Sequence, residues 1–420
     1  MAIFAFFIST LFIGIPIFIV LAGTAMFYLL ITGNMDLFLS YIPQLHSGLS
    51  HFGLLAIPLF ILVGEVMNEA GITRRLINVS KAVIGSVRSG LAFVNVIANG
   101  LMAAIIGSAV AQTAVMSRVM VPEMERNGYN RSIATAITCA GGMLGAIIPP
   151  SMPFIIFAVL SQVPVSDMFL AGVVPGLILA TLFLILTGVL GLIHDFPFSE
   201  KLDRDKVVQA LVVGIPSLSV PVCIVATILM GWGSPVDAAA IGIALSLLIG
   251  FFVHKELNVQ KLSIVLERTA RNSSMVLILV ASASVFGWVI TYQNIPQAIA
   301  NIVSGLASSP VTFLLIVALF LMLIGTVLDG VAAMIIVVPV LQPIASGIYD
   351  IPSVQFGVIV VLTLVLGLIT PPVGASLYVA SGIAGVPPWR LFIAIMPYLF
   401  LATLLVVSLC FFPGIINFWF

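Results

Sequence analysis

Charge is the scarcest property of this chain: only 7% of its 420 residues are Asp, Glu, Lys or Arg, and the mean hydropathy is +1.29. A soluble domain carries about 25% charged residues. The polar side chains are therefore too few to cover a water-soluble globule, and we expect a polytopic membrane protein. The 15 basic and 15 acidic residues cancel, so a nucleic acid is not an expected partner.

Residues that bind metals or catalyse reactions are also scarce, with three cysteines and four histidines. The cysteines lie far apart in apolar segments and the histidines lie in loops or at segment ends, so neither a disulfide nor a zinc site is expected. No G-x-x-x-x-G-K-[ST] motif occurs, which excludes ATP hydrolysis by a P-loop. Because no nucleophile, base or metal set converges, we do not expect an enzyme.

A cleavable signal sequence is not expected either. The first apolar run is longer than a signal h-region and has no basic residues before it. We expect residues 3–32 to form a first spanning helix that is kinked at Pro16. Other full spans are expected at 53–68, 132–161, 168–193, 207–231, 236–253, 273–293, 353–384 and 391–412.

Two further segments, 90–122 and 310–348, are interpreted as re-entrant hairpins. Two complete crossings need roughly 40 apolar residues, and the return arm 109–121 is short and contains Gln112 and Arg118. The second segment is long enough to span twice. We favour a hairpin there because Asp329 lies at its centre and because an internal duplication predicts one.

That duplication is indicated by Gly-rich breaks that contain Pro-Pro in two apolar segments. Four residue pairs share an offset of 222 positions: Gly145 with Gly367, Pro149 with Pro371, Pro150 with Pro372, and Pro175 with Pro397. Duplicated halves with interrupted hydrophobic helices are typical of secondary transporters. We therefore expect an all-α protein with two inverted repeats, residues 1–195 and 207–420, joined by a cytoplasmic linker at 196–206. The broken helices would be 132–161 and 353–384.

The basic residues predict the orientation in the membrane. With the N-terminus in the cytoplasm, all 15 Lys and Arg fall on one side, which satisfies the positive-inside rule and places the C-terminus outside. Near the cytoplasmic end of the second span, we expect Glu65 and Glu69 to be ordinary interface charges or partners of Arg74 and Arg75.

Two short lateral segments are expected to lie along the membrane on opposite sides. They are residues 71–89, in the cytoplasm, and residues 294–309, outside. We expect them to act as hinges between a moving unit, formed by 90–161 and 310–384, and a scaffold. The scaffold would comprise 3–32, 168–193, 207–253 and 391–412.

In an inverted repeat the two hairpin tips and the two helix breaks converge near the midplane. Their carbonyl and hydroxyl oxygens are hard ligands that suit Na+, and helix N-termini just after the breaks suit an anionic substrate. The candidate residues at the tips are Gly107, Ser108, Ala109, Gly325, Thr326 and Asp329. Those at the breaks are Gly145, Pro149, Pro150, Ser151, Thr370, Pro371, Pro372 and Gly374.

Structural roles compete with ligation at these positions. Ser108, Thr113 and Ser151 could be interhelical hydrogen-bonding residues, and the glycines could serve tight turns. For Asp329, the acid expected deep in the bilayer, three roles are open: sodium coordination, proton coupling, or a hydrogen bond that shapes the tip.

At these residues the chain resembles the large membrane subunit of the tripartite ATP-independent periplasmic (TRAP) transporters, over nearly its whole length. The matching stretches are 55–60 with Gly64-Glu65, 107–111, 147–153 and 367–374. The resemblance implies a multi-pass protein of the bacterial inner membrane that works as an elevator. It would take up an organic anion, such as a dicarboxylate or sialic acid, with a sodium gradient.

The resemblance also implies two protein partners: a small four-span membrane subunit and a soluble periplasmic substrate-binding protein. Because the extra domain of fused versions is missing, the small subunit would be a separate polypeptide. The alternative function is a stand-alone ion or dicarboxylate carrier of the same inverted-repeat architecture.

Overall fold

The computed structural model describes residues 2–33, 35–84, 87–198 and 204–419, and within these ranges the chain is helical apart from short turns and one isolated bridge. Seven of the described helical stretches are long and apolar enough to cross a membrane: Phe52–Glu69, Val165–Ile193, Val207–Leu229, Pro235–Val253, Val259–Tyr292, Gly330–Gly347 and Pro388–Phe411. The predicted class, an all-helical multi-span membrane protein, is confirmed.

The N-terminal run is not the single kinked span that the sequence predicted. It forms α1 (Ala2–Phe12) and α2 (Ile17–Thr32), which fold back on one another, with the rings of Phe6 and Phe27 stacked at 4.3 Å. Gly14 adopts a φ of +84° and Pro16 precedes the first residue of α2. Both residues interrupt a helix, and here they reverse the chain instead of bending it. The prediction of a cytoplasmic N-terminus depended on one full crossing and stays untested.

The rest of the first half contains one arm, one hairpin and one broken helix. After α3 (Met35–Leu39) and α4 (Tyr41–Leu49), α5 (Ala56–Glu69) leads to the arm α6 (Ile72–Ile84). The hairpin is α7 (Gly90–Ile106) and α8 (Ala109–Arg126), and the broken helix is α9 (Arg131–Gly142), a 3-10 turn (Met143–Ala146) and α10 (Met152–Ser161). The half ends with α11 (Val165–Ile193).

The second half repeats this order of elements. α12 (Arg204–Leu229), α13 (Pro235–Leu248) and a π-helical turn (Ile249–Val253) precede the long α14 (Val259–Tyr292). The arm α15 (Ile295–Ser304), the hairpin α16 (Pro310–Gly325) and α17 (Gly330–Gly347), the broken helix α18 (Ser353–Gly367) and α19 (Ala375–Ala384), and α20 (Pro388–Phe411) follow. Of the linker expected at 196–206, residues 199–203 lie outside the described part.

Polar residues cap the helix starts that matter for the breaks and hairpins. The Asn130 side chain accepts hydrogen bonds from the amides of Ser132 and Ile133 at the start of α9. Ser309 and Thr312 form a reciprocal capping box at the start of α16. Caps of this kind satisfy main-chain donors that have no partner within the helix, so they fix where each arm of the fold begins.

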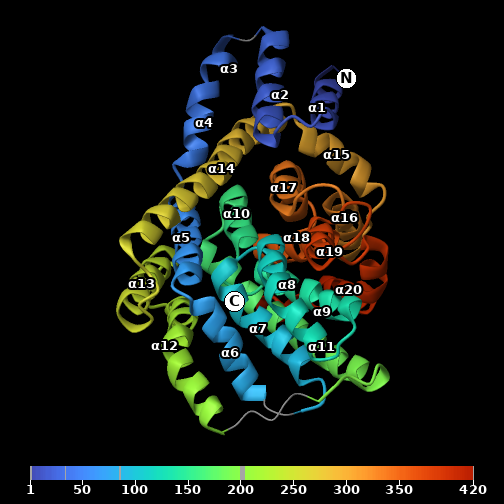
Figure 1. Cartoon of the computed structure of the whole chain (residues 1–420). Coiled ribbons are helices and arrows are strands. Elements are labelled where there is room, and N and C mark those ends of the chain that lie inside the picture. The colour runs from blue at the N-terminus through green and yellow to red at the C-terminus, as the bar shows by residue number, and fades with distance from the viewer. Residues whose placement is uncertain (1, 34, 85–86, 199–203, 420) are drawn as a thin grey trace.

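The two arms lie at opposite ends of the molecule (Figure 1). α6 and α12 occupy the lower end of that view, whereas α1–α4 and α15 occupy the upper end, and α14 runs obliquely between them. Between α14 and α5, Arg268 contacts Glu65 at 3.7 Å and Glu69 at 3.0 Å. Arg74 and Arg75 pair instead with Glu256, at 3.3 and 2.8 Å. The predicted pairing of Glu65 and Glu69 with Arg74 and Arg75 is therefore wrong.

α11 and α20 pack mainly against the hairpin and broken-helix elements, although α11 also contacts α12. The hydroxyls of Thr187 and Tyr398 lie 2.9 Å apart, joining α11 to α20. A Cβ on Gly172 of α11 would come within 3.0 Å of the Ile147 carbonyl at the first break. These contacts favour grouping 168–193 and 391–412 with the broken helices, and the prediction that both segments belong to the scaffold stays untested.

Candidate functional site

Each hairpin tip is hydrogen-bonded to the helix break of its own half. In the first half, the Met152 amide donates to the Gly107 carbonyl at 3.0 Å. In the second half, the amides of Val373 and Gly374 donate to the Thr326 carbonyl at 3.1 and 2.8 Å. Met152 and Gly374 are related by the 222-residue offset, so the two halves use the same tip-to-break contact.

Glycines allow this close approach of backbone to backbone. Gly107, at the end of α7, has a φ of +63°, and an added Cβ would lie 3.1 Å from the Pro150 carbonyl oxygen. A Cβ on Gly367 would lie 2.5 Å from the carbonyl carbon of Gly325, and one on Gly145 would overlap the Gln112 side chain. The glycines are therefore required by packing, whether or not their carbonyls bind an ion.

The two Pro-Pro pairs have the same local geometry. Both Pro149–Pro150 and Pro371–Pro372 have cis peptide bonds. Proline has no N–H, so the Gly145 carbonyl lacks the donor that residue 149 would supply in a continuous helix. Main-chain oxygens freed in this way are available to a cation or to water.

The side chains at the breaks already make hydrogen bonds. The Ser151 hydroxyl is fully buried, donates to the Ala146 carbonyl at 2.5 Å and accepts from the Phe154 amide, so it caps α10. The Thr370 hydroxyl donates to the Leu366 carbonyl at 2.8 Å. Each hydroxyl oxygen keeps a lone pair that could coordinate a cation.

The two tips meet across a small cavity of about 50 Å³. Its lining includes Ser108 and Ala109 from the first tip, Asp329 and Gly330 from the second, and Ala146 and Leu368 from the breaks. The Ser108 side chain makes no capping hydrogen bond to α8. The arrangement brings tips and breaks together as the sequence predicted, although no contact places Thr370 beside Ser108.

Asp329 differs from the buried acid that the sequence suggested. Its carboxylate is exposed and accepts a hydrogen bond from the Val331 amide at 3.1 Å, which makes it the N-cap of α17. Of the three roles that the sequence left open, shaping the tip is the one with a visible contact.

A larger cavity of about 450 Å³ adjoins the first tip. α5 and α14 form one wall of this cavity, and the first hairpin and α10 form the other. Three residues, Ser108, Met152 and Val331, line both this cavity and the small one between the tips. Its polar lining residues are Glu65, Asn68, Thr73, Ser108 and Asn272. Glu65, Asn68 and Thr73 place it toward the end of the molecule that carries α6. A small organic solute could reach the tips through this space.

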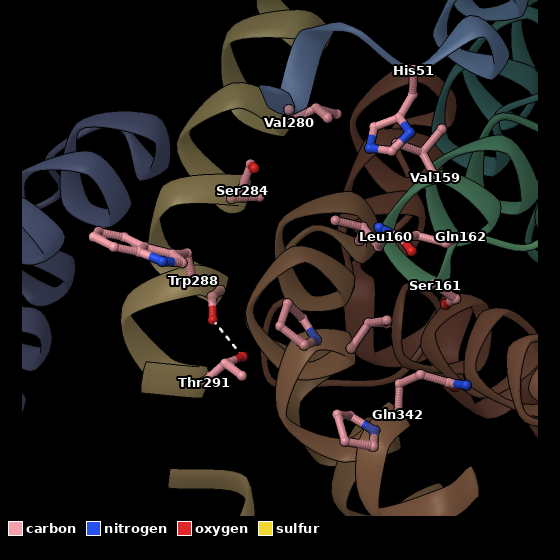
Figure 2. A pocket seen from close by; sticks show the side chains of 16 residues that line it. His51, Val159, Leu160, Ser161, Gln162, Val280, Ser284, Trp288, Thr291 and Gln342 are labelled. Carbon is pink, nitrogen blue, oxygen red and sulfur yellow. Dashed lines mark hydrogen bonds between the residues drawn. The ribbon is translucent and has the colours of Figure 1, made fainter. Parts of the chain in front are cut away.

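A third cavity, of about 410 Å³, lies toward the other end of α14. His51, Ser161, Trp288 and Gln342 are among the residues that line it, and Figure 2 shows their side chains. It contains no candidate site residue. On α14 the larger cavity is lined from Asn272 to Val276 and this one from Val280 to Thr291, so the two cavities follow one another along that helix.

The sequence reasoning used Gln112 to predict the hairpin but named none of three buried amide residues there as site residues. Asn95, Asn99 and Gln112 are fully buried and hydrogen-bonded to one another. Asn95 and Asn99 are four residues apart in an apolar helix, and that spacing on one face is a signal that could have identified them.

Comparison with known proteins identifies the family. The model of the "Tripartite ATP-independent periplasmic transporter, DctM component" matches residues 4–415. The sialic acid TRAP transporter large permease SiaM of Vibrio cholerae is 31% identical over 93% of this chain and 91% of its own length. The 2,3-diketo-L-gulonate large permease YiaN of Escherichia coli is 32% identical over 96% and 95% of the two chains. The C4-dicarboxylate large permease DctM of Pseudomonas aeruginosa is 32% identical over 87% and 85%.

A solved structure also shares the fold. The YdaH transporter of Alcanivorax borkumensis superposes with a TM-score of 0.68 and covers 92% of this chain, with 90% of its own chain covered. Its sequence identity is 17%, so the likeness concerns the fold alone.

Proposed function

The chain belongs to the DctM component family of the tripartite ATP-independent periplasmic transporters, and from this premise we propose that it takes up a carboxylated organic anion coupled to sodium. This family consists of transporter permeases and not of enzymes. The named relatives carry sialic acid, 2,3-diketo-L-gulonate and C4-dicarboxylates, which are all carboxylates.

Sodium coupling is supported by the ligand types at the tips and breaks. Freed carbonyls, hydroxyls and the Asp329 carboxylate lie there, and no Lys, Arg, His or Cys is among the described residues that line the cavity between the tips. Oxygen ligands of this kind favour alkali cations over transition metals. We assign Na+ to two clusters. The first is formed by the Gly107–Ala109 tip with the Gly145–Ser151 break, and the second by the Gly325–Asp329 tip with the Thr370–Gly374 break.

An elevator movement is supported by the distribution of contacts and cavities. The moving unit would comprise α7–α11 and α16–α20, because α11 and α20 pack onto the broken helices. The scaffold would comprise α2, α4–α6 and α12–α14. The hairpins would be re-entrant, and the repeats would be inverted about the membrane plane. The cavity beside Ser108 lies toward the α6 end, so in this conformation the site would face the cytoplasm.

The orientation follows from the basic helices. We propose that the end bearing α6 and α12 faces the cytoplasm of the bacterial inner membrane and that the C-terminus lies in the periplasm. A tripartite system requires a small membrane subunit and a periplasmic binding protein. We propose that the small subunit is a separate four-span polypeptide.

The observation that carries the proposal is the repeated hydrogen bond from break to tip. It is tested by reconstituting the chain in proteoliposomes with the small subunit and the binding protein, and by measuring uptake of radiolabelled sialic acid, 2,3-diketo-L-gulonate and C4-dicarboxylates. We expect uptake of one of them to need an inward Na+ gradient. Equal uptake with K+ or choline would contradict sodium coupling, and uptake without the binding protein would favour the stand-alone carrier.

A further inference from the structure

Three buried amide side chains form a chain of hydrogen bonds inside the first hairpin. Asn95 Nδ2 donates to Thr138 Oγ1 at 2.7 Å, and Asn99 Nδ2 donates to Asn95 Oδ1 at 2.9 Å. Gln112 Nε2 donates to Asn99 Oδ1 at 3.0 Å. This row of hydrogen bonds therefore runs from α9 through α7 to α8, and all three amides are fully buried.

The direction of this chain is fixed by main-chain carbonyls, which can only accept. Gln112 Nε2 also donates to the Asn99 carbonyl at 2.8 Å, and Asn99 Nδ2 also donates to the Asn95 carbonyl at 2.9 Å. Thr138 uses its own hydroxyl proton on the Ala134 carbonyl, so it must accept from Asn95. Turning any one of the three amides over would set two oxygens against each other.

The row of hydrogen bonds ends at an amide oxygen, Gln112 Oε1, that accepts no hydrogen bond from any described residue. This oxygen is buried. It lies against Gly145, where a Cβ would overlap it. The Gly145 carbonyl has itself lost a donor because residue 149 is proline. Two acceptor groups without donors therefore belong to the same turn of the first break.

The next residue of α8 repeats the pattern. Thr113 is fully buried, its Oγ1 has no hydrogen-bond partner in the described structure, and a Cβ on Gly142 would overlap it. Gly142 and Gly145 lie three residues apart, on neighbouring positions of one helical face. Buried oxygens without partners are costly to leave unmatched, and a bound cation that attracts oxygen lone pairs would match both of them.

We propose that Gln112 Oε1 is a side-chain ligand of an alkali cation at the first break, with Thr113 Oγ1 beside it and Asn95 and Asn99 as positioning residues. Neutral oxygens suit a monovalent cation, because divalent ions in proteins take carboxylates. Asn99 prevents the amide from rotating its NH2 toward the ion. The inference rests on the proposed sodium coupling and adds a ligand to it.

The test is the Na+ dependence of thermal unfolding of the purified chain in detergent, with choline keeping the ionic strength constant. The wild type should be stabilised by Na+ and not by choline. In Gln112→Leu the Na+ concentration that gives half of the stabilisation should rise about tenfold or more. Gln112→Asn keeps the amide but moves its oxygen away by one methylene, so it should also raise the Na+ concentration that gives half of the stabilisation. This second variant provides the test if Gln112→Leu does not fold.

Two controls separate ligation from packing. Gln355→Leu removes another buried glutamine, in α18, and should leave the Na+ midpoint unchanged. Asn99→Ala, which frees the Gln112 amide to rotate, should raise the midpoint less than Gln112→Leu does. Suppose that Na+ stabilises the wild type and that both Gln112 variants have the wild-type Na+ midpoint, even if they unfold at a lower temperature. That result would overturn the inference about Gln112 but would not contradict sodium coupling. A wild type without any Na+ response would overturn both.

Discussion

The main-chain amide of Gly374 donates a hydrogen bond to the carbonyl oxygen of Thr326 at 2.8 Å. This contact joins the tip of the second hairpin to the N-cap residue of α19, which follows Pro371–Pro372. Because α17 and α18 lie between the two residues in the chain, the contact sets the second tip against the second break. Its counterpart, from Met152 to Gly107, does the same in the first half.

We predict that Gly367→Ala destabilises the protein. The added methyl group would lie 2.5 Å from the Gly325 carbonyl carbon, so backbone must move, and overpacking of this kind costs about 1–3 kcal/mol. Gly382→Ala in α19 is the matched control, because nothing lies within 4 Å of the added Cβ. Thermal unfolding in detergent should show a loss for Gly367→Ala and none for Gly382→Ala. Equal behaviour of the two would argue against the close approach of tip and helix.

We predict that Ser108→Ala and Thr370→Ala weaken sodium activation more than they weaken expression. A hydrogen-bonding or ligand group that acts on an ion contributes enough to change the activating Na+ concentration about tenfold. Thr403→Ala is the control, since Thr403 and Thr370 both donate to the carbonyl four residues earlier at 2.8 Å. Uptake into vesicles at varied Na+ is the measurement. Wild-type Na+ dependence in both site variants would refute the assignment of these side chains.

The breaks and hairpins were predictable because proline and glycine mark them in the sequence. The structure places α16–α17 within the predicted range 310–348, whereas α7–α8 continues to Arg126, past the predicted end at residue 122. Glycine and proline did not identify the structure at Gly14 and Pro16, because the same two residue types occur both in a kinked helix and in a reversal of the chain. Arg268 could not be assigned to Glu69 because 199 positions separate them. α11 and α20 are apolar on all faces, so nothing in their sequences distinguishes lipid from protein neighbours. The hydrogen bonds that link Asn95, Asn99 and Gln112 could not be predicted, because they depend on how α7, α8 and α9 pack against one another.

We predict a loss of stability below neutral pH that depends on His254. Burial is the largest cause that lowers the pKa of His254 below its ordinary value of 6.5, partly offset by the hydrogen bond with the Ala70 carbonyl. A lowered pKa means that the unfolded chain binds more protons. The contribution of neutral His254 to the stability of the folded protein is therefore complete above pH 6.5 and is lost as the pH falls through the folded-state pKa. Thermal unfolding should be less pH-dependent between pH 5 and pH 7.5 in His254→Gln, and an unchanged slope would contradict this account.

We predict that the two arms are reached from opposite sides of the membrane. Val83 in α6 and Leu306 after α15 have exposed side chains. In a variant without the three native cysteines, Val83→Cys should react with an impermeant maleimide only in inverted vesicles, and Leu306→Cys only in intact spheroplasts. Reaction of both from one side would contradict the inverted repeat.

The movement of one unit against the other is tested most directly by a disulfide across their boundary. A Cβ on Gly287 of α14 would lie 3.3 Å from Cβ of Pro339 in α17, close to the separation of about 3.8 Å that a disulfide needs. As a control within the proposed scaffold, Gly214 of α12 and Val79 of α6 have the same relationship at 3.5 Å.

Both cysteine pairs would be oxidised in proteoliposomes, and Na+-driven uptake measured before and after reduction. We expect the Gly287→Cys/Pro339→Cys pair to stop uptake when oxidised and to recover it when reduced, whereas the Gly214→Cys/Val79→Cys pair should transport in both states. Full uptake by quantitatively oxidised Gly287→Cys/Pro339→Cys protein would contradict the elevator account.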